Sequence, residues 1–215
     1  MEAKTAPALP LLVPTAGERE RLVRRAKMLA RVGLAWHAIE AAAAIGAGVV
    51  AGSIALIGFG ADSLIECVAG VVLLWRFAPT RAGAEWAEHR AHRLIAVSFF
   101  ALAAYVGVES IRSLAGGHEP DASWVGVGLS VVTLAAMPPL ARAKARVGNS
   151  LASAATKSEG RQTMVCAYLS AALLVGLGAN ALLGWWWADP VAALVVGVVA
   201  LNEGRHAWRG EACCH

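Results

Sequence analysis

The sequence predicts an all-α membrane protein that crosses the bilayer six times and has both termini in the cytoplasm. Of its 215 residues, 58% are hydrophobic and only 16% are charged, and the mean hydropathy is +0.57. This composition excludes an ordinary soluble domain of this size. About 20 consecutive apolar residues cross a hydrocarbon core roughly 30 Å thick, and the chain contains several runs of that length.

Six spans account for the apolar runs: residues 31–51, 54–76, 93–115, 123–141, 151–179 and 183–207. The first two are separated because one helix over residues 31–76 would be about 69 Å long at 1.5 Å per residue. That length is about twice what a bilayer requires. We therefore expect the chain to reverse direction at residues 51–53.

The basic residues indicate the orientation. Of the 19 Lys and Arg residues, 18 lie within residues 4–31, 76–93, 142–161 and 205–209, which six spans place on one side of the membrane. Only Arg112 lies on the other side. Because cationic loops stay in the cytoplasm, both termini are expected there. The net charge of +4 is thereby explained by topology, so it does not indicate nucleic-acid binding.

We divide the chain into a cytoplasmic N-terminal arm (1–30), a six-helix transmembrane domain (31–208) and a short cytoplasmic tail (209–215). The arm has no secretory signal, because prolines interrupt its short apolar patch and the basic cluster follows that patch. We expect an amphipathic surface helix from Gly17. The sequence contains no nucleophile–base arrangement or zincin motif, so we do not expect an enzyme.

The segment GADSLIE at residues 60–66 places two carboxylates, Asp62 and Glu66, inside the second span. Four residues apart on a helix, they share one face and lie about 6 Å apart along the axis. Each acid in the bilayer costs about 2.5–3.5 kcal/mol on insertion scales, so the pair requires compensation. We expect no Lys or Arg in the membrane core to provide it. A metal ion or protons remain; the alternative is a pair of permanently protonated acids that bond to neighbouring helices.

The same residues carry a resemblance to a known family. ADSLIE in the second of six spans is similar to the D-S-L-x-D signature of the cation diffusion facilitators, which export divalent metals from the cytoplasm in exchange for protons. The resemblance extends over about residues 30–208 and includes HRAHRLIAVSFFALAAYVGVESIRSL and LSAALLVGLGANALLGWWWADPVAALVVGVVAL. It implies that Asp62 and Glu66 are metal ligands, with Glu66 in place of the usual second Asp. Family members usually carry a cytoplasmic domain after the sixth span, which we do not expect here.

The resemblance places the family's other two ligands, an H-x-x-x-D pair, on the fifth span. Aligned through Ser170, Gly176 and the WWWADP turn, the matching positions are Gln162 and Cys166. Glu159 lies on the same helical stripe and is a further candidate. Two carboxylates, an amide oxygen and a thiolate favour zinc or another borderline-soft metal. Alternatively, Cys166 is a small packing residue, as buried cysteines commonly are.

Three weaker candidates remain. His37 and Glu40 share a face of the first span near its cytoplasmic end. They either bind the ion as it enters or, as we favour, form an internal pair that holds helices together. An accessory metal site in the second cytoplasmic loop would use Glu88, His89 and His92. The tail CCH at residues 213–215 is a potential soft-metal binder. Histidine-rich loops are more often only solvated, and cysteines at a flexible end are more often bystanders.

The resemblance implies efflux of a divalent metal by alternating access. The transported ion would be Zn²⁺ or another divalent transition metal, and protons would be the counter-ion. We expect a homodimer in the cell membrane, specifically the bacterial cytoplasmic membrane. The competing hypothesis is a non-transporting membrane subunit that binds metal or a partner protein and keeps a vestigial site.

Overall fold

The computed structural model describes residues 15–76, 85–117 and 119–209, and gives only the backbone at residues 72, 73, 75, 76, 85–92, 154 and 155. The described residues form six helices and no strand, as the sequence predicts for an all-α polytopic protein. The helices are α1 (Ala16–Ala51), α2 (Ile54–Arg76), α3 (Glu85–Gly116), α4 (Trp124–Ser150), α5 (Ala154–Leu183) and α6 (Ala188–Trp208).

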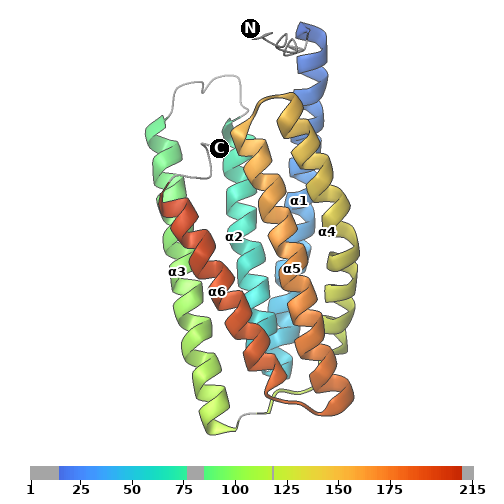
Figure 1. Cartoon of the computed structure of the whole chain (residues 1–215), viewed down its shortest axis with the longest axis vertical. Helices are drawn as coiled ribbons and strands as arrows, with labels where there is room; N and C mark the ends of the chain where they lie inside the picture. Colours follow the sequence, from blue (N-terminus) through green and yellow to red (C-terminus); the bar gives the residue numbers. More distant parts are fainter. Residues whose placement is uncertain (1–14, 77–84, 118, 210–215) are drawn as a thin grey trace, which may run out of the picture.

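The helices run up and down as one bundle in which α2 and α5 occupy the middle (Figure 1). On one side α1 and α4 flank them, and on the other side α3 packs along α6. Helix α2 contacts α1, α3, α5 and α6, so it has neighbours on most of its circumference. A polar residue on α2 can therefore face the protein interior rather than lipid.

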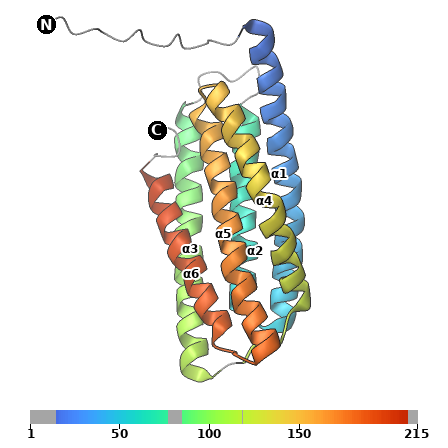
Figure 2. The same ribbon diagram turned by 45° about the vertical axis from the view of Figure 1, so that its right-hand side comes forward.

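Five of the six helices, α1 to α5, are long and apolar enough to cross a membrane by length and composition. Helix α6 has 21 residues and packs against α2, α3 and α5. The start of α1, the ends of α2, α4 and α6, and the starts of α3 and α5 all lie at one end of the bundle (Figures 1 and 2). The clusters of basic residues are at this end, which charge asymmetry assigns to the cytoplasm.

Three helices are clearly longer than the predicted spans, and one of them, α3, begins at Glu85 rather than at residue 93. Helix α1 begins at Ala16, so the surface helix expected from Gly17 is a continuous extension of the first span that projects beyond the bundle (Figure 2). A capping box starts this extension, because Thr15 and Glu18 bond to each other's backbone N–H groups. Helix α4 continues to Ser150 rather than stopping near residue 141, so only residues 151–153 connect it to α5.

The interior is filled by apolar side chains from all six helices, and the large residues Leu56, Phe59, Met137, Leu169 and Leu173 are fully buried. Large apolar residues are also exposed on the outward faces of the helices, for example Val50, Leu94, Tyr168 and Val198. An apolar exterior over a tightly packed interior is what a bilayer environment requires.

Asp189, at the start of α6, closes the N-terminus of α2. Its Oδ2 accepts hydrogen bonds from the backbone N–H groups of Ile54 (3.0 Å) and Ala55 (3.4 Å). Its Oδ1 accepts a bond of 2.5 Å from the hydroxyl of Ser53. All helix N-termini leave N–H groups without intrahelical partners, and here a residue about 135 positions away satisfies two of them. The α1–α2 reversal predicted at residues 51–53 is confirmed, and α6 holds it in place.

Glycines let α1 and α2 approach closely. A Cβ atom on Gly60 would lie 2.9 Å from the backbone nitrogen of Ile45, and one on Gly48 would lie 2.9 Å from that of Ile57. Both distances are shorter than a carbon–nitrogen contact allows, so larger residues would force the two helices apart. This contact fixes the face that α1 presents to α2.

We expect Asp189→Ala to lower the free energy of unfolding by about 1–3 kcal/mol, because buried N–H groups lose their acceptor. Titration with SDS in mixed micelles measures this change. Glu109→Ala is the matched control, since Glu109 forms an ion pair with Arg112 on α3 whose Arg side chain is 72% exposed. The control should change stability by less than about 1 kcal/mol. Equal effects of the two substitutions would contradict the capping role.

We expect Gly60→Ala to destabilise the protein by about 1–3 kcal/mol, because the added methyl group meets the backbone of α1. Gly46→Ala is the control, because a Cβ atom there has no contact within 4 Å. That substitution should leave stability unchanged or raise it through helix propensity. The same micelle titration compares them, and a neutral Gly60→Ala would show that α1 and α2 are not in close contact.

Candidate functional site

The two carboxylates of α2 point into the bundle. Asp62 is 5% exposed and Glu66 is 7% exposed. Glu66 lies about 15 Å from the cytoplasmic end of α2 and about 18 Å from the other end, given a rise of 1.5 Å per residue. Both acids therefore lie inside the protein near the middle of the membrane, where water does not compensate their charge.

Glu66 meets a histidine and a cysteine from two other helices. Ligand atoms of Glu66, His37 on α1 and Cys166 on α5 all lie within 4.8 Å of one another, and the three residues are buried. His37 Nε2 is 2.9 Å from Glu66 Oε2. An oxygen, a nitrogen and a sulfur donor thus converge on one point between α1, α2 and α5.

One of these donor atoms, a carboxylate oxygen of Glu66, lacks a regular hydrogen bond. Oε2 of Glu66 is fully buried and accepts no hydrogen bond of regular geometry, although His37 Nε2 lies at ion-pair distance. A buried carboxylate oxygen without hydrogen bonds costs free energy. The close polar contact of this oxygen in the described residues is thus the ring nitrogen of His37.

Glu40, which is fully buried, lies behind His37. Side chains from four helices contact its two oxygens: Trp36 and His37 of α1, Ser63 of α2, Thr133 of α4 and Cys166 of α5. The His37 contact joins Nδ1 to Oε2 at 3.2 Å, and Ser63 donates to the same oxygen at 2.9 Å. Glu40 is thus held by far more bonds than Glu66 and cannot turn easily toward a guest ion.

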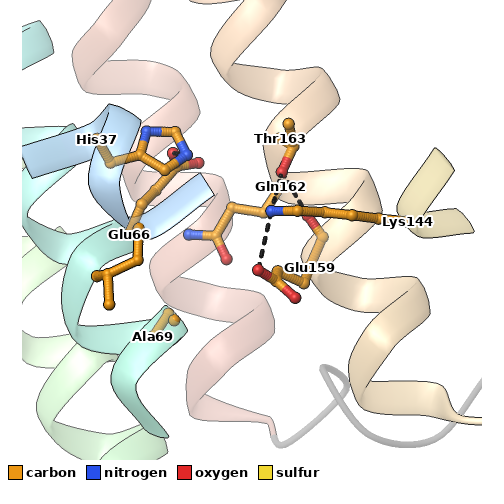
Figure 3. A pocket seen from close by; sticks show the side chains of 9 residues that line it. His37, Glu66, Ala69, Lys144, Glu159, Gln162 and Thr163 are labelled. Atoms are coloured by element: carbon orange, nitrogen blue, oxygen red, sulfur yellow. Dashed lines mark hydrogen bonds and ion pairs between the residues drawn. The ribbon is translucent and has the colours of Figure 1, made fainter. Parts of the chain in front are cut away.

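A pocket roughly the size of one water molecule extends from His37 and Glu66 toward the cytoplasmic end of the bundle. Figure 3 shows Glu66 reaching toward the imidazole ring of His37, and Gln162 extending from α5 into the pocket. Lys144 and Glu159 line its far side. Of the residues proposed from the fifth span, Gln162 therefore lies next to Glu66, whereas Glu159 lies nearer the mouth.

Lys144, which the sequence predicts to lie in a cytoplasmic connection, is a buried residue of a helix. This residue lies on the extended part of α4 and is 1% exposed. Its Nζ is 2.8 Å from Glu159 Oε1 and donates to the hydroxyl of Thr163 at 3.1 Å. Gly33 on α1 leaves the space that Lys144 occupies, since a Cβ there would lie 2.7 Å from Nζ. Lys144 compensates Glu159, and no ion pair joins it to Asp62 or Glu66 in the described residues.

Asp62 lies one turn further from the cytoplasm. Within the described part of the chain it makes no hydrogen bond or ion pair. The titratable groups close enough to interact with it electrostatically are Glu66, His37, Glu40 and Glu203. Glu203 comes from α6, is half-buried, and also acts on Glu66. Sequence reasoning did not select Glu203, because a single acid near the end of an apolar run is typical of a helix terminus.

His37 and Glu40 contact each other as the favoured internal pair, and His37 also lies directly beside Glu66. The residues of the possible accessory site, Glu88, His89 and His92, have side chains outside the described part of the structure, as does the tail at residues 213–215. The i, i+3 spacing of His37 and Glu40 signalled their shared face. Nothing in their local sequence shows which helix that face meets.

The assembled groups suit a divalent transition metal. Imidazole nitrogen, carboxylate oxygen and thiolate sulfur are the three ligand types that zinc uses in proteins. Magnesium and calcium prefer oxygen ligands only, so sulfur and nitrogen donors at one point favour a borderline-soft ion.

Comparison with known proteins agrees with this chemistry. The family model described as the cation efflux transmembrane domain matches residues 30–209. A relative from Synechocystis sp., described as the uncharacterized transporter sll1263, is 26% identical over 173 residues, which is 77% of this chain and 56% of the relative. The chain thus spans about half the length of that relative. Because the family model covers most of the sequence, the chain belongs to the cation efflux family of membrane transport proteins.

Proposed function

We propose that the protein exports a divalent metal ion, with zinc as the main substrate, in exchange for protons. The observation that carries the proposal is the buried Glu66 carboxylate. One of its oxygens lacks a regular hydrogen bond, and a thiol and an imidazole lie within 4.8 Å of it. A cation bound there would satisfy the oxygen and offset the cost of burying the acid.

The pocket supports loading from the cytoplasm. It lies on the cytoplasmic side of Glu66, and Gln162 extends into it, so an ion entering from that side meets an amide oxygen before the carboxylate. Asp62, one turn further along α2, is the next acidic group toward the opposite side. Binding of the ion between Asp62 and Glu66 needs both in their ionised forms.

Protons complete the cycle through the same groups. Metal ligands must be deprotonated, so metal binding releases protons, and proton uptake from the outer side weakens the site. Protons then neutralise the empty acids during the return, which avoids an unpaired anionic pair in a medium of low dielectric constant. Alternating access of one site to the two sides of the membrane couples the fluxes in opposite directions.

We expect Glu66→Gln to reduce zinc flux into proteoliposomes by at least about tenfold, because even groups that only support metal ligands change affinity by about 10–100-fold. Flux is followed with a zinc-sensitive dye and a pH-sensitive dye trapped in the lumen, under an imposed proton gradient. Asp62→Asn should have the same effect. Glu109→Gln, which removes a partly exposed carboxylate on α3, should leave the flux unchanged.

Wild-type zinc flux in Glu66→Gln would reject the site. If wild-type protein bound zinc at equilibrium but moved none, and released no protons into the lumen, the transport proposal would fail. The protein would then act as a metal-binding membrane subunit.

We expect Cys166→Ser to shift metal preference from zinc toward manganese, because a hydroxyl group is a harder ligand than a thiolate. The ratio of zinc flux to manganese flux should fall on the order of tenfold. The measurement is a panel of Zn²⁺, Mn²⁺, Co²⁺ and Ni²⁺ in the same vesicles. Cys67→Ser is the control, because Cys67 is a half-buried thiol of α2 that donates weakly to the carbonyl of Leu34. An unchanged ratio would show that Cys166 only packs.

A further inference from the structure

We infer that His37 of α1 is a metal ligand of this site and that Glu40 is the residue that positions its ring. The inference rests on the proposed function, since it adds to the same binding site. It gives α1 a direct part in binding, in place of an entry step or a purely structural pair. The ion would then be held by three helices: α1, α2 and α5.

The distances fit one shared ion. Ligands of a tetrahedral zinc at about 2.0–2.3 Å lie roughly 3.3–3.8 Å from one another. In the structure His37 Nε2 and Glu66 Oε2 are 2.9 Å apart, and no ligand atom of the His37, Glu66 and Cys166 group is more than 4.8 Å from another. Shifts of about 1 Å, within the reach of side-chain rotation, bring these atoms to zinc-binding distances.

Glu40 orients the ring. Metal-binding histidines commonly donate their second ring N–H to a carboxylate, which fixes the ring and leaves the other nitrogen for the metal. His37 Nδ1 is 3.2 Å from Glu40 Oε2, and Nε2 points to Glu66. Glu40 is itself fixed by bonds from α1, α2 and α4. Its many donors make it a support for the ring rather than a ligand.

The α5 residue beside Glu66 in the pocket is an amide rather than an imidazole. Gln162, the α5 residue that lines the pocket beside Glu66, offers only a neutral amide. An amide oxygen binds a borderline-soft ion less strongly than an imidazole nitrogen does. His37 of α1 supplies such a nitrogen 2.9 Å from Glu66 Oε2.

The test uses the full chain with His37 as its one histidine. The other five are replaced by glutamine, and Cys213 and Cys214 of the tail by serine; the histidines replaced are His89, His92, His118, His206 and His215. X-ray absorption of the zinc-loaded protein in detergent reports the atoms bound to the metal. We expect one imidazole and one sulfur in the first shell, and the imidazole signal must come from His37.

Binding variants extend the test. His37→Gln in the wild-type chain should weaken equilibrium zinc binding by more than about tenfold, and Glu40→Gln should weaken it by about 10–100-fold while the zinc-bound sulfur remains. His206→Gln, which removes an exposed histidine of α6, should leave the affinity unchanged. If Glu40 only supports the fold, Glu40→Gln leaves the number of imidazoles around the metal unchanged. If Glu40 positions the ring of His37, that number falls in the variant.

Two results would overturn the inference: a first shell without imidazole in the single-histidine protein, or wild-type zinc affinity in His37→Gln. Neither result touches the transport proposal, which fails only if Glu66→Gln retains zinc flux or the wild-type protein moves none. Should His37→Gln not fold, the absorption experiment on the single-histidine protein still decides the question.

Discussion

The buried carboxylate of Glu40 is the interaction on which the rest of the site depends. In an interior without water, a carboxylate needs donors for both oxygens, and these donors come from α1, α2, α4 and α5. Satisfying this one acid therefore brings four helices to a common point. The position of His37 beside Glu66, and of Cys166 opposite, follows from that requirement.

The site combines two acids in different conditions. Glu40 has an excess of donors, whereas Glu66 has a buried oxygen without a regular hydrogen bond. The bonds of Glu40 are already made, whereas the close polar contact of Glu66 in the described residues is the imidazole of His37, 2.9 Å away. Lys144 and Glu159 show a third arrangement, a closed ion pair whose charges compensate each other at the mouth of the pocket. The three acids, two of them buried and Glu159 partly exposed, thus have three different surroundings.

Much of the fold could be predicted, because the bilayer imposes strong rules on a chain. Apolar run length located the helices, and the distance argument placed the reversal at residues 51–53. The distribution of basic residues did not predict the end of α4, because a lysine after an apolar run indicates a cytoplasmic loop. Lys144 is buried in the helix because it bonds to Glu159 and Thr163. The burial of Asp62 and Glu66 could be inferred, because acidic side chains in a membrane span almost always face the protein interior or a water-filled cavity. The contact of His37 with Glu66 could not, because it depends on how α1 is rotated against α2.

The convergence of helices on Glu40 also bears on how the protein can move. Separating α1, α2, α4 and α5 at this level would leave several donors without acceptors at the same time, so these four should pivot together about a fixed centre. Helices α3 and α6 contribute no donor to Glu40 among the described residues, and they pack mainly along each other. Movement of the four-helix group against the α3–α6 pair would leave every bond to Glu40 intact.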